Sequence, residues 1–395
     1  MSARLSNPLN WLYGGVTDLR NWLYDSRIKE TLRPPVYTIG VGNLTVGGTG
    51  KTPQVDYLLQ LLKSVPGKEE GLIATLSRGY GRRTRGFRIA GASDTADTIG
   101  DEPLLLYRKH APGVTVCVGE KRAEAIPQLL TARPGLQVIV LDDAYQHRPV
   151  SPHLNLLLTD YHRLFFNDAP FPGGRLRERR HGAGRADAVL VTKCPEDLSP
   201  AEQTEIRETI RRYGKPDVPV FFTGLAYGEP VPYHPPAPSL IRRGSVKAPQ
   251  PPDGGVESGG AKPPEGEKGA TSPPPHQGGG RGVVLVSGIA RPEPLERYVA
   301  GHFQLAAHLP FPDHHRYSAA DLRRIRQAVP AGGAVLTTEK DFVKLEPLVA
   351  GSRQDLPDFY YLPIAVKFLN SEEQFKSMIT LAGGLETAPA PVKKS

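Results

Sequence analysis

Short apolar segments alternate with segments of helical periodicity along the first half of the chain. Six segments are short and almost wholly apolar: 36–41, 72–76, 114–118, 138–141, 154–158 and 188–191. Between some of them lie stretches that we predict to be helical: 52–63, 102–109 and 122–130. Because strands buried on both faces lack polar alternation, the pattern predicts an α/β fold whose mainly parallel sheet has helices on both faces.

A second group of apolar segments predicts a second, smaller α/β domain. These segments are 283–287, 334–338 and 359–362. We expect the first domain to span residues 34–222 and the second 223–386. Within the second, residues 245–282 include 18 Pro or Gly among 38 residues. With almost no large apolar side chains, this insertion cannot offset its ordering entropy by burial, so we expect disorder. Residues 387–395 are expected to form a loose tail.

Residues 1–33 are predicted to contain an amphipathic helix. Apolar residues recur near helical spacing at Leu9, Leu12, Val16, Leu19 and Leu23. Both tryptophans, Trp11 and Trp22, lie here among basic residues. Aromatic rings beside cations suit a helix lying in a membrane interface. The alternative is an ordinary helix packed on the domain, and Gly14-Gly15 weakens any helix prediction here.

Composition narrows the class of protein. The chain has 395 residues, of which 39% are hydrophobic and 23% charged, as in a soluble protein with more than one domain. Two cysteines exclude a disulfide framework and a four-thiolate zinc site. There is no stretch of about 18–20 apolar residues that would span a membrane. The N-terminus also lacks a secretory signal's apolar core, so we expect a cytoplasmic protein.

Charge indicates an anionic partner without identifying it. Lysines and arginines outnumber aspartates and glutamates by 49 to 41, for a net charge of +8. Phosphorylated metabolites, nucleic acid and acidic lipid all fit this excess.

A phosphate-binding loop is the strongest local signal. Residues 43–52 read NLTVGGTGKT and lie between a predicted strand and a predicted helix. The glycines let several N–H groups face one phosphate, Lys51 can reach the β- and γ-phosphates, and the Thr52 hydroxyl can bind Mg²⁺. The usual motif opens with Gly where Thr45 stands, and the Gly47-Gly48 pair can restore flexibility. A glycine-rich turn with a chance Gly-Lys-Thr is the alternative. The predicted ATP-binding residues are Thr45, Val46, Gly47, Gly48, Thr49, Gly50, Lys51 and Thr52.

Two acidic pairs can complete this site. Asp142-Asp143 follows the buried strand 138–141, at the sheet end where ligands bind, and can hold Mg²⁺. An Asp-Asp turn is the alternative. Asp101-Glu102 lies at a predicted helix start, where carboxylates often cap a helix. Beside a phosphate loop, the same pair can bind metal or accept a hydroxyl proton.

Basic and histidine-containing segments add candidates. Residues 77–82 (SRGYGR) follow a predicted strand with two arginines, enough for an anionic substrate. Residues 175–180 form a basic run of the kind that is usually a solvated face. Asp313-His314-His315 ends an apolar stretch, and because adjacent histidines rarely bind one ion, it indicates a single catalytic or orienting histidine.

Together these segments resemble the tetraacyldisaccharide 4′-kinase family, the lipid A kinases of Gram-negative bacteria. The resemblance covers most of the chain outside the insertion. It rests on segments in the family's order: 12–13, 20–25, 42–53, 77–82, 100–103, 142–147, 176–178, 313–315 and 337–341. The family also carries Ser or Thr at the position of Thr45. Two departures are Ala144-Tyr145, where the family more often has Gly-Phe, and the long insertion.

The resemblance implies transfer of the ATP γ-phosphoryl group to the 4′-hydroxyl of a tetraacylated glucosamine disaccharide 1-phosphate, giving lipid IVA. It implies that Asp101 and His314 activate the hydroxyl while Lys51 neutralises charge. Mg²⁺ would be managed by Thr52, Glu102, Asp142 and Asp143. Substrate-binding candidates are Asn43, Arg78, Tyr80, Arg122, Gln146, His147 and Arg177. Because His314 comes from the second domain, the two domains would close to complete the site.

The same resemblance implies a location and partners. We expect a monomer that binds the cytoplasmic face of the inner membrane peripherally through its N-terminal helix. We expect the acylated disaccharide 1-phosphate as its lipid substrate and no nucleic-acid partner.

Two other classes of protein remain as alternatives. A P-loop GTPase or metallochaperone often carries Lys where Val46 stands, and its Asn/Thr-Lys-x-Asp motif is approached by residues 192–195, but Pro195 replaces the Asp. A non-catalytic, nucleotide-gated module for membrane or nucleic acid is permitted by the charge. It leaves Asp101 and His314 without a function, and nothing resembles a nucleic-acid-reading motif.

Overall fold

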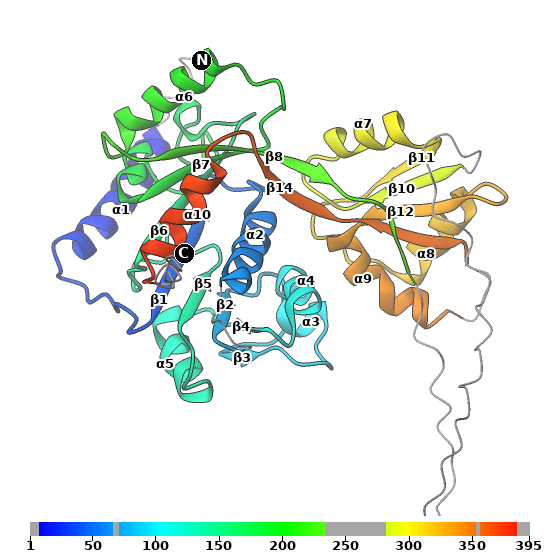
Figure 1. The fold of residues 1–395 in the computed structure, drawn as a ribbon, viewed down its shortest axis with the longest axis horizontal. Helices are drawn as coiled ribbons and strands as arrows, with labels where there is room; N and C mark the ends of the chain where they lie inside the picture. Colours follow the sequence, from blue (N-terminus) through cyan, green and yellow to red (C-terminus); the bar gives the residue numbers. More distant parts are fainter. Residues whose placement is uncertain (1–7, 66–70, 234–281, 353–355, 385–395) are drawn as a thin grey trace, which may run out of the picture.

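The computed structural model describes residues 8–65, 71–233, 282–352 and 356–384. Apart from Gly282, the expected insertion at 245–282 lies outside the described residues, as does the expected tail at 387–395. Figure 1 shows two bodies, a larger one built on a nine-stranded sheet and a smaller one built on five strands. These are the α/β layers that the sequence predicts.

The larger sheet is mostly parallel. From one edge to the other its strands are β14 (Ile364–Phe368), β8 (Val220–Tyr227), β7 (Ala188–Thr192), β6 (Leu154–Asp160), β1 (Tyr37–Asn43), β5 (Val138–Leu141), β2 (Ile73–Ser77), β4 (Val114–Val118) and β3 (Arg88–Ile89). The two edge strands β14 and β3 run antiparallel to their neighbours. The six apolar segments predicted as strands in this half are confirmed as β1, β2, β4, β5, β6 and β7.

Helices cover both faces of this sheet. They are α1 (Pro8–Asp25), α2 (Lys51–Ser64), α3 (Ala96–Ile99), α4 (Asp101–His110), α5 (Arg122–Ala132), α6 (Pro200–Tyr213), α10 (Glu372–Leu381) and the 3-10 helices η2 (Phe165–Asn167) and η3 (Arg180–Arg185). Alternate residues of one strand enter different cores. In β5, Val138 and Val140 share a core with α2 and α10, whereas Ile139 and Leu141 share another with α5. Burial on both faces explains why these strands lack polar alternation.

The smaller body has its own two-sided sheet. Its strands lie in the order β11 (Leu305–Pro310), β10 (Val283–Ser287), β12 (Ala334–Thr338), β13 (Asp358–Leu362) and β9 (Val231–Pro232). Its helices are α7 (Glu293–His302), α8 (Ala319–Ala328) and α9 (Glu339–Ala350). Buried residues of β10 and β12 contribute to two cores, one with α7 and one with α8 and α9.

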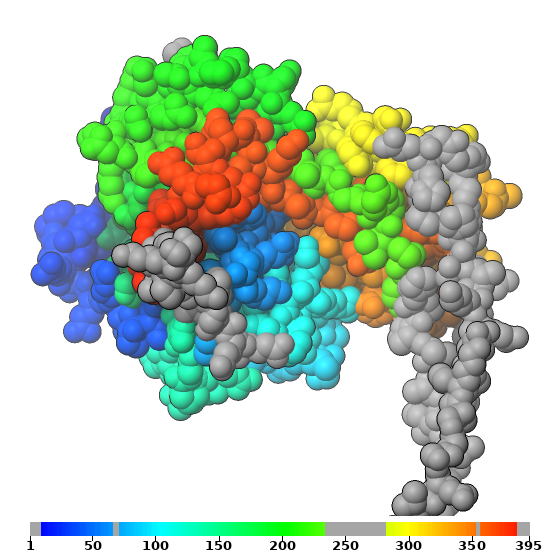
Figure 2. Space-filling view, in the orientation of Figure 1, coloured from blue at the N-terminus to red at the C-terminus, as the bar shows by residue number. Residues whose placement is uncertain are grey.

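The C-terminal segment differs from the expectation that residues 223–386 form one domain. β14 pairs with β8 in the larger sheet, and Phe375 and Ile379 of α10 lie fully buried in that sheet's core. Figures 1 and 2 show this red segment lying on the larger body. The chain therefore leaves the first sheet along β8 and returns along β14. A short strand pattern such as 364–368 does not encode which sheet it joins.

Helix α1 packs with its polar side inward. Asn10 and Asn21 are buried, whereas Trp11, Leu12, Val16, Leu19 and Trp22 are all more than half exposed. Asn21 Nδ2 donates to Glu178 Oε2 at 2.8 Å, and the Gly173 N–H donates to Asn10 Oδ1. The apolar face of the helix is therefore left without a covering element in the part of the chain that is described. None of the described helices combines the length and apolar character needed to cross a bilayer.

We predict that Gly42 of β1 tolerates no side chain. A Cβ there would lie 2.6 Å from Tyr145 Cβ and 2.7 Å from the Tyr145 backbone nitrogen. Gly42→Ala should lower the free energy of unfolding by about 1–3 kcal/mol, because the packed turn must move. Gly15→Ala is the matched control, since a Cβ on this α1 glycine meets nothing within 4 Å and should stabilise by up to about 1 kcal/mol. Urea titrations measure both, and equal loss in the two variants would contradict the prediction.

Candidate active site

The phosphate loop connects β1 to α2 at the carboxyl end of the larger sheet. Gly47 and Gly50 have φ of +116° and +79°, values that favour glycine. Thr45 is not among the residues with positive φ, and it forms an isolated antiparallel bridge with Leu176. The position where the usual motif has glycine therefore demands no left-handed backbone here. Its neighbour Val46 is exposed.

Lys51 is held at the start of α2 by two oxygen atoms. Its Nζ lies 3.3 Å from Asn43 Oδ1 and 3.4 Å from Asp143 Oδ1. Asn43 is fully buried, and its Nδ2 donates to the Thr45 carbonyl at 2.7 Å. Asn43 therefore positions the lysine and the loop, and its burial does not fit the expected contact with substrate.

The acidic pair after β5 has two different environments. Asp142 is buried, and burial raises the pKa of its carboxyl to about 7. Despite burial, Lys51 and Arg177 lower the pKa of Asp143, with Arg177 Nη1 3.1 Å from the carboxylate. Asp143 has a φ of +47°, so the turn is tight. Arg122 is also buried and donates to the carbonyls of Asp142 and Asp143 at 3.0 and 3.3 Å, so it supports the turn and is not available at the surface.

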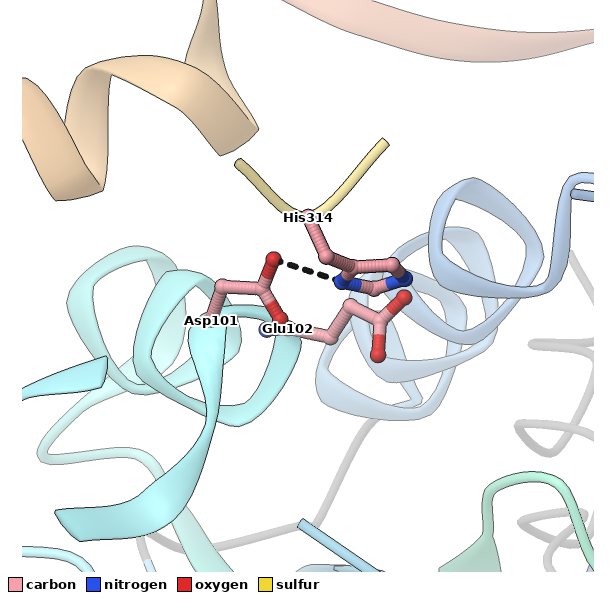
Figure 3. A group of neighbouring side chains, drawn as sticks. All are labelled: Asp101, Glu102 and His314. Atoms are coloured by element: carbon pink, nitrogen blue, oxygen red, sulfur yellow. Dashed lines mark hydrogen bonds and ion pairs between the residues drawn. The ribbon is translucent and has the colours of Figure 1, made fainter. Parts of the chain in front are cut away.

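Asp101 and Glu102 form the first turn of α4, and His314 approaches them from the smaller body (Figure 3). Gly100, with φ of +96°, precedes the pair and lets the chain enter the helix. His314 Nδ1 lies 2.9 Å from Asp101 Oδ2, although the residues are 213 positions apart. The pairing of Asp101 with His314 that the resemblance implies is thus present in the structure.

The charge states of this pair follow from their contacts. Burial alone would raise the pKa of Asp101, but the hydrogen bond from His314 and the nearby Lys340 and Lys344 lower it to about 2. The ionised carboxylate can only accept, so His314 Nδ1 carries the proton of their hydrogen bond. The same bond raises the pKa of His314. Burial raises the pKa of Glu102.

Lys340 and Asp313 also belong to this cluster, although the sequence motifs containing them gave neither a role. Lys340 Nζ lies 3.0 Å from Asp313 Oδ1 and 3.4 Å from His314 Nε2. It lines the same cleft as Gly48–Pro53, Glu102 and residues 289–291 of the smaller body. The available signal was the position of residues 339–341 directly after a buried strand, the same position that marks Asp142-Asp143.

The remaining predicted substrate residues differ in accessibility. Arg78 and Tyr80 are exposed, and the Tyr80 ring lies 5.3 Å from the His314 ring. Gln146 Nε2 donates to the Asn43 carbonyl at 2.8 Å and to Glu178 Oε1 at 3.0 Å. His147 is partly buried, and burial and three arginines lower its pKa to about 4.

Glu178 connects these loops to α1, a role that its motif did not reveal. This buried carboxylate accepts from Asn21, Gln146 and Arg185. Arg177, which neighbours it, holds Asp143 as described above, and its carbonyl accepts from the Tyr13 hydroxyl of α1. Helix α1 is therefore fixed directly to the loops around the acidic pair.

The residues predicted to hold Mg²⁺ form a fitting donor set. Thr52, Glu102 and Lys51 line one cleft, and Asp142 and Asp143 follow the strand next to β1. Asp142 Oδ1 and Thr49 Oγ1 are buried and have no hydrogen-bond partner among the described residues. Hard oxygen donors left without partners beside a phosphate loop suit Mg²⁺.

Lys193, the lysine that the guanine-recognition alternative needs, has other partners. Lys193 pairs with Asp160 at 2.9 Å and donates to the carbonyl of Gly48. It therefore supports the phosphate loop, where the guanine-binding interpretation would need it beside a base.

Comparisons with known proteins identify the family of this chain. A model of the family tetraacyldisaccharide-1-P 4′-kinase matches residues 2–382. The tetraacyldisaccharide 4′-kinase of Bacteroides thetaiotaomicron is 36% identical, covering 94% of this chain and 91% of its own. That of Flavobacterium johnsoniae is 38% identical, with 93% of each covered. The solved structure of "apo" form LpxK from Aquifex aeolicus in complex with ATP is 26% identical with a TM-score of 0.66, covering 95% of this chain and 97% of that one. The resemblance drawn from the motifs is confirmed, and this chain belongs to the tetraacyldisaccharide 4′-kinase family.

Proposed function

We propose that this chain transfers the γ-phosphoryl group of ATP to the 4′-hydroxyl of tetraacyldisaccharide 1-phosphate, forming lipid IVA in lipid A biosynthesis. The observation that carries the proposal is the Asp101–His314 hydrogen bond beside the cleft lined by the phosphate loop. A nucleotide-binding loop alone would fit many activities, whereas a base held next to it suits transfer to an acceptor that must lose a proton, as a hydroxyl does.

In the reaction, the 4′-oxygen forms a bond to the γ-phosphorus while the bond from phosphorus to the β,γ-bridging oxygen breaks. The electron pair of the broken bond leaves with ADP. Asp101 holds His314 through Nδ1, so Nε2 is the nitrogen that takes the hydroxyl proton. The hydrogen bond to Asp101 raises the pKa of His314, which favours this transfer.

The larger sheet supplies the donor half of the site. Lys51 and the backbone of residues 47–50 bind the β- and γ-phosphates, and Asn43 keeps the lysine directed at them. Thr52, Glu102, Asp142 and Asp143 would hold Mg²⁺, which neutralises phosphate charge when bound. Because phosphoryl transfer depends mainly on positioning and electrostatics, these groups are chemically sufficient.

The acceptor is anionic and acylated, and the surface near the dyad fits it. Arg78 and Tyr80 are the exposed candidates for contact with the sugar phosphate, and Gln146, His147 and Arg177 lie on the loops attached to α1. The buried Asn43 and Arg122 act through the residues they hold.

Helix α1 is suited to place the protein on the cytoplasmic face of the inner membrane. Its exposed apolar face includes two tryptophans. Its polar face forms hydrogen bonds with residues 146, 177 and 178 in the loops of the site. A helix in the interface would thus bring the site to a lipid whose acyl chains stay in the bilayer. We propose a peripheral membrane protein that acts as a monomer.

A labelling assay tests the reaction. We expect the purified chain with Mg²⁺ and γ-labelled ATP to label detergent-dispersed tetraacyldisaccharide 1-phosphate, and Lys51→Ala to abolish the label. GTP in place of ATP should support much less transfer, since Lys193 is engaged by the phosphate loop. An unlabelled lipid from folded, ATP-binding protein would reject this acceptor, and preference for GTP would favour the GTPase alternative.

Removing either member of the dyad should stop turnover without preventing nucleotide binding. We expect Asp101→Ala and His314→Ala to lower kcat by about 10²–10⁴-fold, the usual contribution of a positioned base. ATP affinity, measured by calorimetry, should change little. His315→Ala is the matched control, since its ring pairs with Asp321 at 3.2 Å within the smaller body. Near-normal turnover in either dyad variant would remove that residue from the mechanism.

Apolar residues of α1 should control membrane binding. Leu12 and Leu19 are 67% and 59% exposed, so Leu12→Gln with Leu19→Gln should leave folding intact. Each apolar side chain moved out of a bilayer loses about 1.5–3 kcal/mol, so co-flotation with phosphatidylethanolamine–phosphatidylglycerol vesicles should weaken by about tenfold or more. Leu381→Gln on α10, where the leucine is 56% exposed, is the control. Equal weakening by the control would contradict a role for α1.

A further inference from the structure

Residues 337–341 (TTEKD) carry a chemistry that the dyad and phosphate loop do not explain. Thr337 and Thr338 end β12, and α9 begins at Glu339. Asp341 is fully buried and accepts hydrogen bonds from the Gly288 N–H and the Thr338 hydroxyl, both at 2.8 Å. The Thr338 hydroxyl also accepts from the Asp341 N–H at 3.0 Å. These hydrogen bonds fix the turn at both ends, and they therefore also fix the direction of the Lys340 side chain in the first turn of α9.

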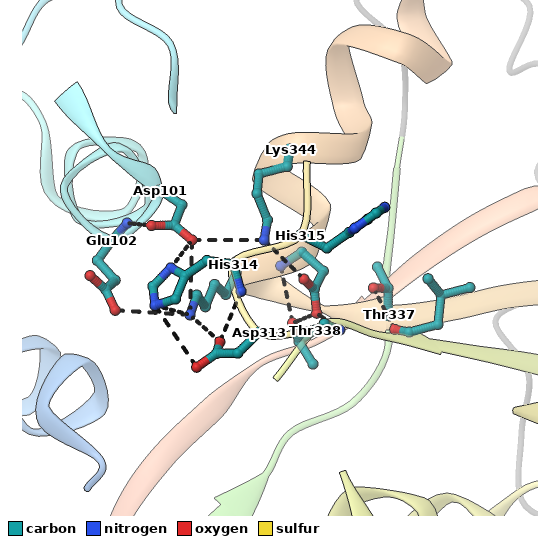
Figure 4. Close-up of polar contacts among 12 residues, drawn as sticks. Asp101, Glu102, Asp313, His314, His315, Thr337, Thr338 and Lys344 are labelled. Carbon is teal, nitrogen blue, oxygen red and sulfur yellow. Dashed lines mark hydrogen bonds and ion pairs between the residues drawn. The ribbon is translucent and has the colours of Figure 1, made fainter. Parts of the chain in front are cut away.

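The Lys340 ammonium lies among acidic groups of both bodies. Besides Asp313 and His314, it lies 3.9 Å from Asp101 Oδ2 and 3.9 Å from Glu102 Oε1. Asp101, Glu102 and His314 together have the spacing of a metal-binding group. The structure places an ammonium group within 4 Å of all three, so this cluster already has its cation. Figure 4 shows the carboxylates and His314 converging from two sides.

The Lys340 side chain is exposed enough, and has enough free N–H donors, to bind a ligand in the cleft. Its side chain is 18% exposed and lines the nucleotide cleft together with Lys51. The ammonium has three N–H groups, and the contacts at hydrogen-bond distance in the described structure are those to Asp313 and His314 Nε2. At least one N–H group is therefore available to an oxygen entering the cleft.

We propose that Lys340 is a catalytic residue that contacts the transferred γ-phosphoryl group, so that the smaller body supplies a cation to face Lys51 of the larger one. The inference rests on the proposed function. As the 4′-oxygen bonds to phosphorus and the bond to ADP breaks, charge spreads over the three phosphoryl oxygens, and Lys340 neutralises part of it without giving up a proton. When Lys340 moves from His314 Nε2 to a phosphoryl oxygen, it also frees the nitrogen that takes the hydroxyl proton.

A second lysine on α9, Lys344, provides a comparison that separates two possible roles of Lys340. Lys344 lies one turn further along, 3.7 Å from Asp101 Oδ2 and 3.2 Å from Asp341 Oδ1. Its side chain is 7% exposed, and it lines no part of the nucleotide cleft. Both lysines place positive charge beside Asp101, but Lys340 alone of the two faces the nucleotide. Loss of charge near Asp101 and loss of contact with phosphate can therefore be separated.

The test compares Lys340→Met, Lys340→Arg and Lys344→Met in the labelling assay, with ADP affinity measured by calorimetry. We expect Lys340→Met to lower kcat by about 100-fold or more, the usual effect of removing one charge-stabilising donor, with ADP affinity within about twofold of wild type. Lys340→Arg should recover at least about tenfold of that loss, because the cation returns. Binding of a non-hydrolysable ATP analogue relative to ADP should weaken in Lys340→Met and not in Lys344→Met.

The outcomes separate this inference from the proposed function. A kcat within tenfold of wild type in Lys340→Met overturns it, as does a loss that Lys340→Arg does not recover, or an unchanged preference for the analogue over ADP. Should Lys340→Met fail to melt cooperatively, Lys340→Gln takes its place. Wild-type protein that labels no lipid would instead count against the proposed function, and an active Asp101→Ala would count only against the dyad.

Discussion

The hydrogen bond between Asp101 and His314 is the contact on which the site depends, because its partners belong to different bodies. It forms only while α4 of the larger body is docked against α9 and its neighbouring loop. Two ion pairs on α4 support that docking: Arg108 with Glu346 and Lys109 with Glu339. Lys51 and the Asp142-Asp143 pair lie in the larger body, whereas His314, the proposed base, comes from the smaller one. Docking thus assembles the chemistry at the cleft that holds the nucleotide.

Burial of several carboxylates at one sheet edge is the electrostatic cost of this design. Moving a carboxylate out of water costs free energy, and repulsion between neighbouring carboxylates adds to that cost. The pKa shifts of these carboxyls differ from one position to the next. Asp101 and Asp143 have cationic partners that lower their pKa, whereas burial raises the pKa of Asp142 and Glu102. Asp142 and Glu102 are both candidate metal ligands, so a divalent cation would help to keep them ionised, in addition to Lys340 beside Glu102.

Local sequence was enough to predict the strands and the phosphate loop but not the depth at which each residue lies. The phosphate loop and the Asp142-Asp143 turn follow from apolar strands ending in residues of known chemistry. Asn43 and Arg122 have the side chains of substrate ligands, yet both are buried, and only packing reveals this. The return of residues 364–381 to the first sheet was hidden for a related reason, since pairing between distant strands has no local signature.

Helix α1 inverts the usual rule for an amphipathic helix on a globular protein. Its periodicity fits an ordinary packed helix and an interfacial one equally well, because the pattern gives the width of the apolar face and not its direction. The structure gives the direction: Asn10 and Asn21 face the protein, and the apolar residues face outward. Asn21 bonds Glu178, which also holds Gln146 beside the phosphate loop. A membrane that bound the apolar side, as proposed, would therefore hold the loops bonded to α1 at a fixed distance and angle from its surface.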